Sequence, residues 1–191
     1  SLVQINISAS KSLKNIDGLK GLKALKTIEI SNAESLENLD GLHGCDSLEE
    51  IYISGGSWDR SSNKQPAENI DGLKGLNKLK IVDLSNFNSL KNVDGFKGCS
   101  ALESLSIQSD SLENIDGLKN LKALNSITLN IVNLKNVDGL AGCENLEDCL
   151  INSQYSDQIC RNLENLNGLK GLNKIKELTI PASSILINLD G

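Results

Sequence analysis

The side chains that could perform catalysis are few in this chain, and their positions favour no reactive site. The 191 residues include five cysteines, one histidine and no methionine. Cys45, Cys99 and Cys143 each stand where neighbouring copies of the same sequence pattern carry a leucine, which predicts buried thiols. His43 has no serine or cysteine partner at a spacing that would form a nucleophile–base pair. We therefore expect no enzymatic activity, no cofactor and no metal site.

The two remaining cysteines and the repeated aspartates each leave a second interpretation open. Cys149 and Cys160 could form a disulfide or remain free thiols, because one lies in a predicted strand and the other in an insertion. Aspartates that precede a glycine recur along the chain and would suit calcium, but Asp-Gly is more typical of a tight turn. We adopt the turn interpretation.

The overall composition indicates an ordinary globular protein with excess negative charge. Apolar residues make up 39% of the chain and charged residues 23%. Nineteen basic against 25 acidic residues give a net charge of −6, which repels nucleic acid and anionic lipid. No apolar run approaches the ~18 residues that a membrane span needs. We expect neither nucleic-acid binding nor membrane insertion.

The cysteines and the Asp-Gly pairs described above belong to a repeat that runs through the whole chain. The phrase Asn-(Ile/Leu/Val)-Asp-Gly-(Leu/Phe) recurs every 22–23 residues, with two longer intervals of 31 and 29. Its third position is Asp17, Asp40, Asp71, Asp94, Asp116, Asp138, Asn167 and Asp190. We expect one domain over residues 1–191, with about seven full repeats, as part of a longer chain. The two longer intervals predict insertions near 55–66 and 153–162.

A second phrase, L-x-x-ψ-x-ψ with ψ apolar, lies between these corners and predicts a short strand. Its copies start at Leu2, Leu25, Leu48, Leu79, Leu102, Leu124, Leu146 and Ile175. The alternation at its end is typical of a half-buried strand, and the leucines three apart after each Asp-Gly favour a short helical or 3₁₀ turn with the Asp as N-cap. Such units bury an apolar face only when stacked, so we expect eight parallel strands in one sheet.

Two details of this stack are predicted from the same pattern. The asparagine before each corner, for example Asn38, Asn92 and Asn114, is expected to be buried and to satisfy backbone groups of its own or adjacent units. The apolar side chains at the two ends of the stack are expected to be partly exposed or covered by another chain. They are Leu2, Ile5, Ile7, Leu186 and Leu189.

The residues from Ile16 to Ile30 resemble a known family. Their spacing, Ile-x-x-Leu-x-x-Leu-x-x-Leu-x-x-Ile-x-Ile, is similar to the leucine-rich repeat, most closely to the short repeats of internalins, with some receptor L-domain character. The resemblance implies an α/β solenoid, a right-handed superhelix with one curved parallel β-sheet on its concave face and short helical or 3₁₀ turns on its convex side. It also implies a protein-binding module, with an extracellular or cell-surface location favoured over the cytoplasm.

The outward positions of the predicted strands are mostly acidic. The second, third and fifth positions should face the concave surface. They hold eight acids (Glu29, Glu49, Glu50, Asp83, Glu103, Glu147, Asp148 and Glu177) and three lysines (Lys26, Lys80 and Lys176). The second positions alternate in charge and should pair across strands. The remaining acids are either a solvated face or a surface that steers a partner with a basic patch.

The two insertions hold side chains that often dominate protein interfaces. Trp58 and Arg60 lie in the first insertion, and Tyr155 and Arg161 lie in the second. We expect these four, together with Tyr52, to frame a protein-binding patch whose floor is acidic. The floor residues are Glu50, Asp83 and Asp148. Alternatively, the loops cover the sheet edge, or the chain is a structural segment of a longer surface or filament array with end-to-end or homo-oligomeric contacts.

Overall fold

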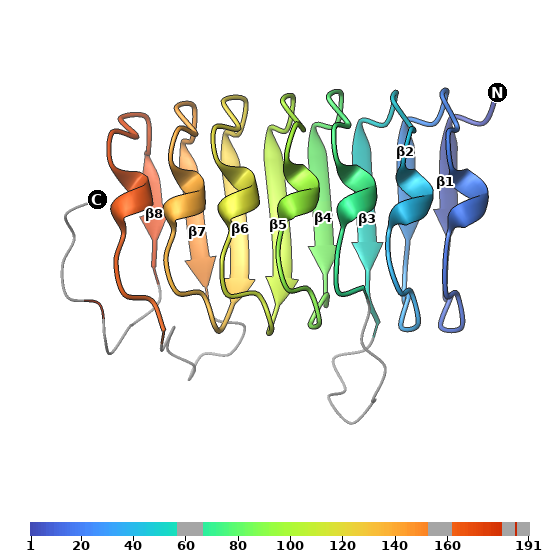
Figure 1. The fold of residues 1–191 in the computed structure, drawn as a ribbon, viewed down its shortest axis with the longest axis horizontal. Coiled ribbons are helices and arrows are strands. Elements are labelled where there is room, and N and C mark those ends of the chain that lie inside the picture. The colour runs from blue at the N-terminus through green and yellow to red at the C-terminus, as the bar shows by residue number, and fades with distance from the viewer. Residues whose placement is uncertain (57–66, 153–161, 181–185, 187–191) are drawn as a thin grey trace.

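The computed structural model describes residues 1–56, 67–152, 162–180 and 186, and these form an open solenoid (Figure 1). One sheet runs along it, in which all strands are parallel and follow the chain order. The strands are β1 (Gln4–Ile7), β2 (Thr27–Ile30), β3 (Glu50–Ser54), β4 (Ile81–Ser85), β5 (Ser104–Ser109), β6 (Ser126–Ile131), β7 (Asp148–Asn152) and β8 (Glu177–Thr179). The predicted eight parallel strands are therefore confirmed.

Short 3₁₀ helices form the opposite side of the solenoid, one between each pair of neighbouring strands. They are η1 (Asp17–Leu19), η2 (Asp40–Leu42), η3 (Asp71–Leu73), η4 (Asp94–Phe96), η5 (Asp116–Leu118), η6 (Asp138–Leu140) and η7 (Asn167–Leu169). Each begins at the Asp or Asn of the corner phrase, so the predicted 3₁₀ turn is confirmed. Among the described residues, no helix is long and apolar enough to cross a bilayer.

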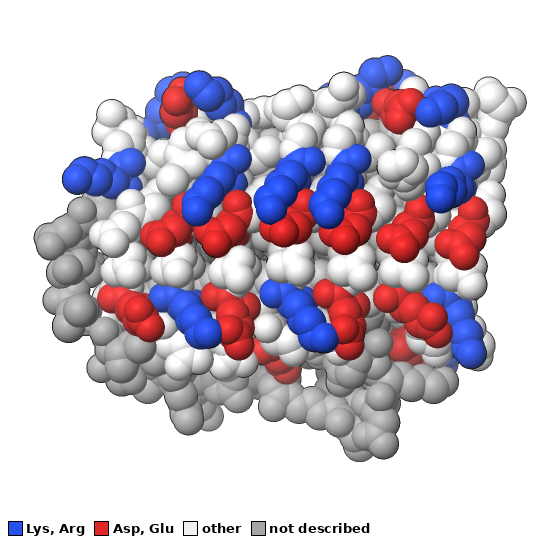
Figure 2. Space-filling model, in the orientation of Figure 1, with Lys and Arg blue, Asp and Glu red and all other residues white. Residues whose placement is uncertain are grey.

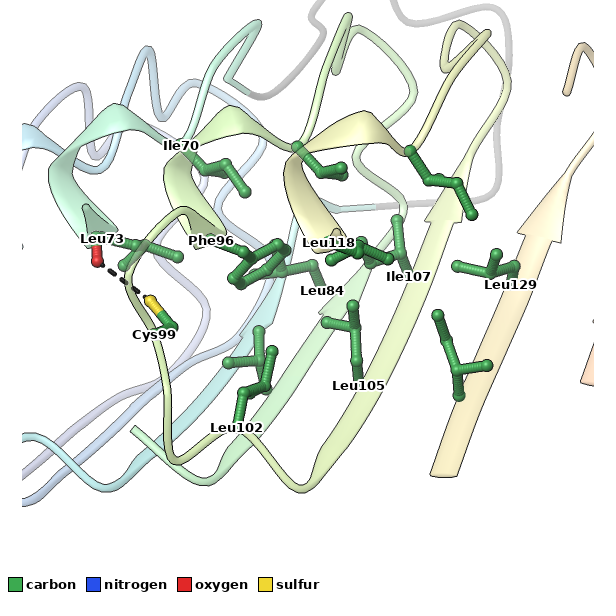
Figure 3. Close-up of a cluster of buried hydrophobic side chains, with 14 of the residues drawn as sticks. Ile70, Leu73, Leu84, Phe96, Cys99, Leu102, Leu105, Ile107, Leu118 and Leu129 are labelled. Carbon is green, nitrogen blue, oxygen red and sulfur yellow. Dashed lines mark hydrogen bonds between the residues drawn. The ribbon is translucent and has the colours of Figure 1, made fainter. Parts of the chain in front are cut away.

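The core lies between the sheet and the 3₁₀ helices, in rows that run along the solenoid. The register aligns equivalent positions of all strands, so that Ile28 lies beside Ile51 and Ile30 beside Ile53. Leu25 and Ile28 are fully buried, and so are their counterparts in the central units. Figure 3 shows these rows in the centre of the molecule. The predicted inward positions are confirmed.

The recurring asparagine forms a local turn instead of filling the core. In all seven described corners its side-chain Oδ1 accepts the backbone N–H of the residue two positions later, over 3.0–3.3 Å. This is an Asx turn. Asn38, Asn92 and Asn114 are half-buried, so the prediction of burial was wrong, although the predicted backbone hydrogen bond within the same unit is present. Because this hydrogen bond joins residues only two positions apart, the asparagine side chain can make it from the surface.

The Asp of the corner is not the helix cap that the sequence predicts. It is the first residue of each 3₁₀ helix, and the capping position belongs to the apolar residue before it, which makes no side-chain cap hydrogen bond. In three units the Asp carboxylate instead pairs with the lysine three residues later, over 2.9 Å. The asparagine two residues upstream supplies the acceptor that the Asp was expected to supply.

From the second to the seventh corner, contact with the preceding unit requires the glycine that follows the Asp or Asn. A Cβ at Gly95 would lie 2.0 Å from the carbonyl oxygen of Ile70, which is shorter than any real contact. The same distance is 1.8–2.1 Å at Gly41, Gly72, Gly117, Gly139 and Gly168. Gly18, in the first unit, has nothing within 4 Å of that position. Backbone contact between adjacent 3₁₀ helices therefore selects glycine.

Three cysteines form a column on every second unit. Cys45, Cys99 and Cys143 are buried free thiols, as predicted. Each Sγ donates a hydrogen bond to a carbonyl oxygen of the preceding 3₁₀ helix, to Leu19 (3.3 Å), Leu73 (3.3 Å) and Leu118 (3.4 Å) respectively. Figure 3 shows the bond from Cys99 to Leu73. Burial raises the pKa of Cys99 and Cys143 to about 11, so both thiols stay protonated at neutral pH.

Cys149 is a buried free thiol, so the disulfide alternative that involved it was wrong. Its side chain points from β7 into the core, as the strand pattern requires, and burial raises its pKa to about 12. Cys160 lies outside the described residues.

The ends of the sheet expose apolar side chains. Leu2 and Val3 are 51% and 45% exposed, and Ile5 and Ile7 are half-buried. At the other end Leu178 is 43% exposed and Leu186 is half-buried, while Leu189 lies outside the described residues. The predicted partial exposure is confirmed for the four predicted residues that the structure describes.

Candidate protein-binding face

The outward side of the sheet is built from three rows of side chains, which we name by their position in the strand phrase. The second-position row lies just before the strands, and the third- and fifth-position rows alternate with the buried fourth and sixth positions. Cross-strand register aligns each row, for example Glu29 with Tyr52 and Tyr52 with Asp83 in the fifth-position row. Three positions of each strand phrase therefore supply the side chains of the concave face.

The second-position row neutralises much of its own charge. Glu49 lies between Lys26 and Lys80, and each lysine Nζ is 3.1 Å from a carboxylate oxygen of Glu49. The hydrogen bonds from Lys80 and Lys26 hold the pKa of the Glu49 carboxyl below its usual value, and the same contact raises the pKa of Lys80. Lys176 pairs with Glu147 in the same way. The predicted pairing of charges across strands is confirmed in this row.

The convex side also pairs its charges. Figure 2 shows this side, on which a row of lysines lies directly above a row of acids, and lysines and acids alternate along a second line below them. The i,i+3 pairs Asp71–Lys74 and Asp116–Lys119 each span 2.9 Å. Pairs between neighbouring units, such as Glu68 with Lys91 and Glu113 with Lys135, form the other line. The acid excess of the chain therefore does not arise on this side.

The third- and fifth-position rows contain acids and no base. The third positions are Gln4, Thr27, Glu50, Ile81, Ser104, Ser126, Asp148 and Glu177. The fifth positions are Asn6, Glu29, Tyr52, Asp83, Ser106, Thr128, Leu150 and Thr179. Five carboxylates thus lie on one surface, and no ion pair between described residues involves them. They are Glu29, Glu50, Asp83, Asp148 and Glu177.

A small hollow lies at the fifth-position row of β2, β3 and β4. Its volume is about 160 Å³, and it is lined by Glu29, Ile30, Ser31, Tyr52, Ile53, Ser54, Asp83 and Ser85. Tyr52 stands between the two carboxylates in the register. Partial burial, a hydrogen bond to Glu50 and the nearby charges of Asp83 and Glu29 raise the pKa of the Tyr52 hydroxyl. The phenol therefore stays neutral and acts as a donor.

A second, broader hollow crosses the sheet between β4 and β7. Its volume is about 580 Å³, and it is lined by Ile81, Glu103, Ser104, Ala123, Asn125, Ser126, Asn145 and Glu147. Its polar groups are mostly amides and hydroxyls, so it offers both donors and acceptors. No group of three His, Cys, Asp or Glu side chains within the described ranges could hold a metal ion.

The structure brings together some of the sequence-predicted site residues. Tyr52, Glu50 and Asp83 are neighbours on β3 and β4, whereas Asp148 lies on β7, four strands along from β3. The positions of four more are not described, because they lie in residues 57–66 and 153–161. These are Trp58, Arg60, Tyr155 and Arg161.

Sequence reasoning missed the hydroxyl lining of the small hollow. Ser31, Ser54 and Ser85 occupy equivalent positions directly after the sixth position of the phrase. This recurrence was visible in the sequence, because Ser8 stands at the same place in the first unit. Glu29 was counted among the concave acids, but its alignment with Tyr52 and Asp83 requires the strand register.

Comparison with known proteins gives structural similarity without sequence similarity. No protein-family model and no curated protein sequence matches the chain. An internalin (inlF) from Listeria monocytogenes matches with a TM-score of 0.61 and 17% identity, over 90% of this chain and 52% of its own. Internalin C2 from the same organism matches with a TM-score of 0.58 and 22% identity, over 87% of this chain and 75% of its own.

This chain therefore spans about half the length of the first of these structures. At such identities the similarity concerns the fold alone. It agrees with the parallel sheet, the regular 3₁₀ turns and the 22–23-residue period. The chain therefore folds as a leucine-rich-repeat solenoid.

Proposed function

We propose that the protein is a non-enzymatic binding module that recognises another protein through its concave face and its two insertions. One observation carries this proposal. The third- and fifth-position rows hold five carboxylates and no base, whereas the second-position row and the convex side pair their charges. A fold that needed only polar residues on an open sheet would have no reason to concentrate one sign there.

The chemistry of this face favours a partner with a basic patch. Exposed charges of one sign raise the rate of encounter with the opposite charge and reject partners of the same charge. The hydroxyls and amides that share the face would then fix the orientation of the partner by hydrogen bonding. Because the repeats resemble those of internalins, we place the module outside the cell or on its surface.

The test compares two variants with the same change of net charge. In the concave variant Glu29, Glu50, Asp83, Asp148 and Glu177 are changed to Gln or Asn. In the convex control five exposed acids are changed to Gln, namely Glu37, Glu68, Glu113, Glu144 and Glu164. Peptides selected by display on the wild-type protein should be rich in lysine and arginine. They should bind the convex control normally, lose affinity for the concave variant and weaken as salt is added.

Selected ligands that bind the concave variant as well as the wild type would reject the proposal. The contribution of the insertions is tested separately. Trp58→Ala combined with Arg60→Ala should weaken binding by ~2 kcal/mol or more and leave the melting temperature nearly unchanged. If the double variant loses stability and keeps its affinity, the loop covers the sheet edge.

The alternative role, as a structural segment of a longer array, rests on a different observation. Leu2 and Val3 are among the large apolar side chains that the described residues expose, and they directly precede β1, the first strand of the sheet. Exposed apolar surface at a sheet edge favours association. Sedimentation analysis across a wide concentration range distinguishes the two roles. A monomer favours the binding module, and growing oligomers favour the array.

A further inference from the structure

The hollow beside Tyr52 is the part of the concave face with the most complete set of polar contacts. Three adjacent strands contribute to it, and the register places Glu29 and Asp83 on either side of Tyr52. Since neighbouring strands are about 4.8 Å apart, the backbones that carry the two carboxylates are separated by roughly 10 Å. The volume of about 160 Å³ would hold about five water molecules or the flat head of one long side chain.

Both carboxylates and the phenol are oriented by neighbouring side chains. Asn6 Nδ2 donates to Glu29 Oε2 over 2.8 Å, and Ser85 Oγ donates to Asp83 Oδ1 over 2.9 Å. The Tyr52 hydroxyl bonds to Glu50. Among the described residues, each of these two contacts uses one carboxylate oxygen, so the other oxygen of Glu29 and of Asp83 can accept from a ligand. Such fixed groups lose little freedom on binding, which favours affinity.

The nearest lysines on the sheet do not neutralise this hollow. Lys26 and Lys80 belong to the second-position row, and both bind Glu49, outside the lining of the hollow. Their combined charge with Glu49 is +1, which offsets only part of the charge of Glu29, Glu50 and Asp83. Among the described residues at this end of the sheet, the net charge therefore remains negative.

We propose that this hollow, which we call the Tyr52 clamp (Glu29, Tyr52 and Asp83), binds the guanidinium group of an arginine from a partner protein. The inference rests on the proposed function and names the chemistry that this part of the face recognises. A guanidinium presents several donors in one plane, so it can contact carboxylates on two sides, whereas a lysine ammonium is a point charge. The same plane stacks on an aromatic ring, which Tyr52 supplies.

Three serines add hydroxyl groups to the hollow. Ser31 directly follows β2, and Ser54 and Ser85 are the last residues of β3 and β4. The Ser31 and Ser54 hydroxyls already accept the backbone N–H groups of Ala9 and Asn32, and the Ser85 hydroxyl donates to Asp83. Each hydroxyl oxygen has two lone pairs, so it can also accept from a guanidinium N–H that the carboxylates do not reach. An aliphatic side chain would displace water from the carboxylates and hydroxyls of the hollow without replacing its hydrogen bonds, which disfavours such a ligand.

The experiment measures binding at Tyr52 directly. The protein carries two tyrosines, Tyr52 and Tyr155, so ring-labelled tyrosine gives few signals, and Tyr52→Phe assigns them. The probe is the peptide acetyl-Gly-Ser-Arg-Ser-Gly-amide, and the comparison probe has lysine in place of arginine, at matched ionic strength. We expect the arginine peptide to shift the Tyr52 signals saturably and to bind several-fold tighter than the lysine peptide.

Variants then distinguish specific binding at the clamp from general attraction to the negative charge of the face. Glu29→Gln and Asp83→Asn should each weaken the arginine peptide by about tenfold, as expected for the loss of one charge-assisted contact. Tyr52→Leu, followed by the shifts of backbone amides in β2 and β4, should remove the preference for arginine over lysine. The control is Asp148→Asn, which makes the same change of charge on the same face at β7 and should weaken binding less than twofold. Unchanged melting temperatures confirm that the variants are folded.

Three results would overturn the clamp: no saturable shift of Tyr52, equal binding of the lysine peptide, or an Asp148→Asn effect as large as that of Glu29→Gln. These results are distinct from failure of the proposed function. If display-selected ligands depend on the concave acids but the arginine peptide does not reach Tyr52, the binding module stands and the clamp is wrong. If the arginine peptide binds at Tyr52 but selected ligands ignore the concave acids, the concave face is not the main site for protein partners.

Discussion

Replacing the corner glycine by alanine should have very different consequences in two units that share the Asn-(Ile/Val)-Asp-Gly corner. In Gly95→Ala the new Cβ would lie 2.0 Å from the Ile70 carbonyl oxygen, 2.6 Å from its carbon and 2.8 Å from Cγ1 of the same residue. Two of these three atoms are backbone atoms of the preceding unit, so relief requires the two units to move apart by about 1 Å or more. In Gly18→Ala nothing lies within 4 Å of the new atom.

The magnitude follows from this geometry. Overpacking a well-packed interior typically costs about 1–3 kcal/mol, and a clash with backbone belongs at the upper end, so we expect Gly95→Ala to lose about 3 kcal/mol. For a chain of this size, each kcal/mol lowers the melting temperature by about 2–4 °C, so the loss should be roughly 6–12 °C. Gly18 has no positive φ, so alanine there should change stability by about 0.5 kcal/mol or less, or stabilise slightly by restricting the unfolded chain.

The assay is urea and thermal unfolding followed by far-ultraviolet circular dichroism, with both variants and the wild type measured in parallel. The m-value shows whether the variants still unfold with the same exposure of surface. If Gly95→Ala is as stable as the wild type, the contact between adjacent 3₁₀ helices does not select glycine. If Gly18→Ala is as damaging as Gly95→Ala, glycine is required by the turn itself and the explanation from unit-to-unit contact is wrong.

Three further predictions follow from the corner, the thiols and the paired charges. Asn92→Ala should lower the free energy of unfolding by about 0.5–1.5 kcal/mol in urea titration, and Asn92→Asp, which keeps the acceptor, should lose less. Cys99 and Cys143, whose pKa values are raised to about 11, should react with iodoacetamide at pH 8 only slowly until urea unfolds the chain. Because the folded pKa of Glu49 is lowered, its stabilisation is present above the unfolded value of about 4.5 and is lost as the pH falls through the folded value. The difference in melting temperature between wild type and Glu49→Gln should therefore shrink below about pH 4.5.

Much of the fold could be predicted from the sequence because it depends on two periodicities. The alternation at Ile28 and Ile30 predicts which side chains are buried, and the recurrence of this phrase predicts which strands are neighbours. Once both are known, a parallel stack follows from the need of each unit to cover its apolar side. The same reasoning correctly predicted buried thiols at the three positions where cysteine replaces a core leucine.

The corner was predicted less well, because its residue types allow more than one hydrogen-bonding pattern. Asn and Asp both accept backbone N–H groups, and the sequence does not show which of them does so. The structure assigns that role to the asparagine, which can act from the surface, and leaves the Asp side chain to pair with lysine in several units.

The candidate site was only partly predictable, because it depends on relations between strands. Glu50, Tyr52 and Asp83 could be placed on one face by their position in the phrase, but the alignment of Glu29 with Tyr52 depends on the register. The hydrogen bonds that orient Glu29 and Asp83 join side chains whose distance the pattern does not specify. The insertions follow no period, so the pattern makes no prediction about their conformation.

The contact between each corner glycine and the carbonyl of the preceding unit also limits the curvature of the solenoid. A repeat array bends when its units are spaced more widely on one side than on the other. Backbone contact keeps the 3₁₀ helices close together, so their spacing cannot greatly exceed the roughly 4.8 Å between strands on the other side. The sheet therefore forms a shallow floor instead of a deep arch. Such a floor suits an extended segment lying across the strands better than a rounded domain enclosed between the two ends.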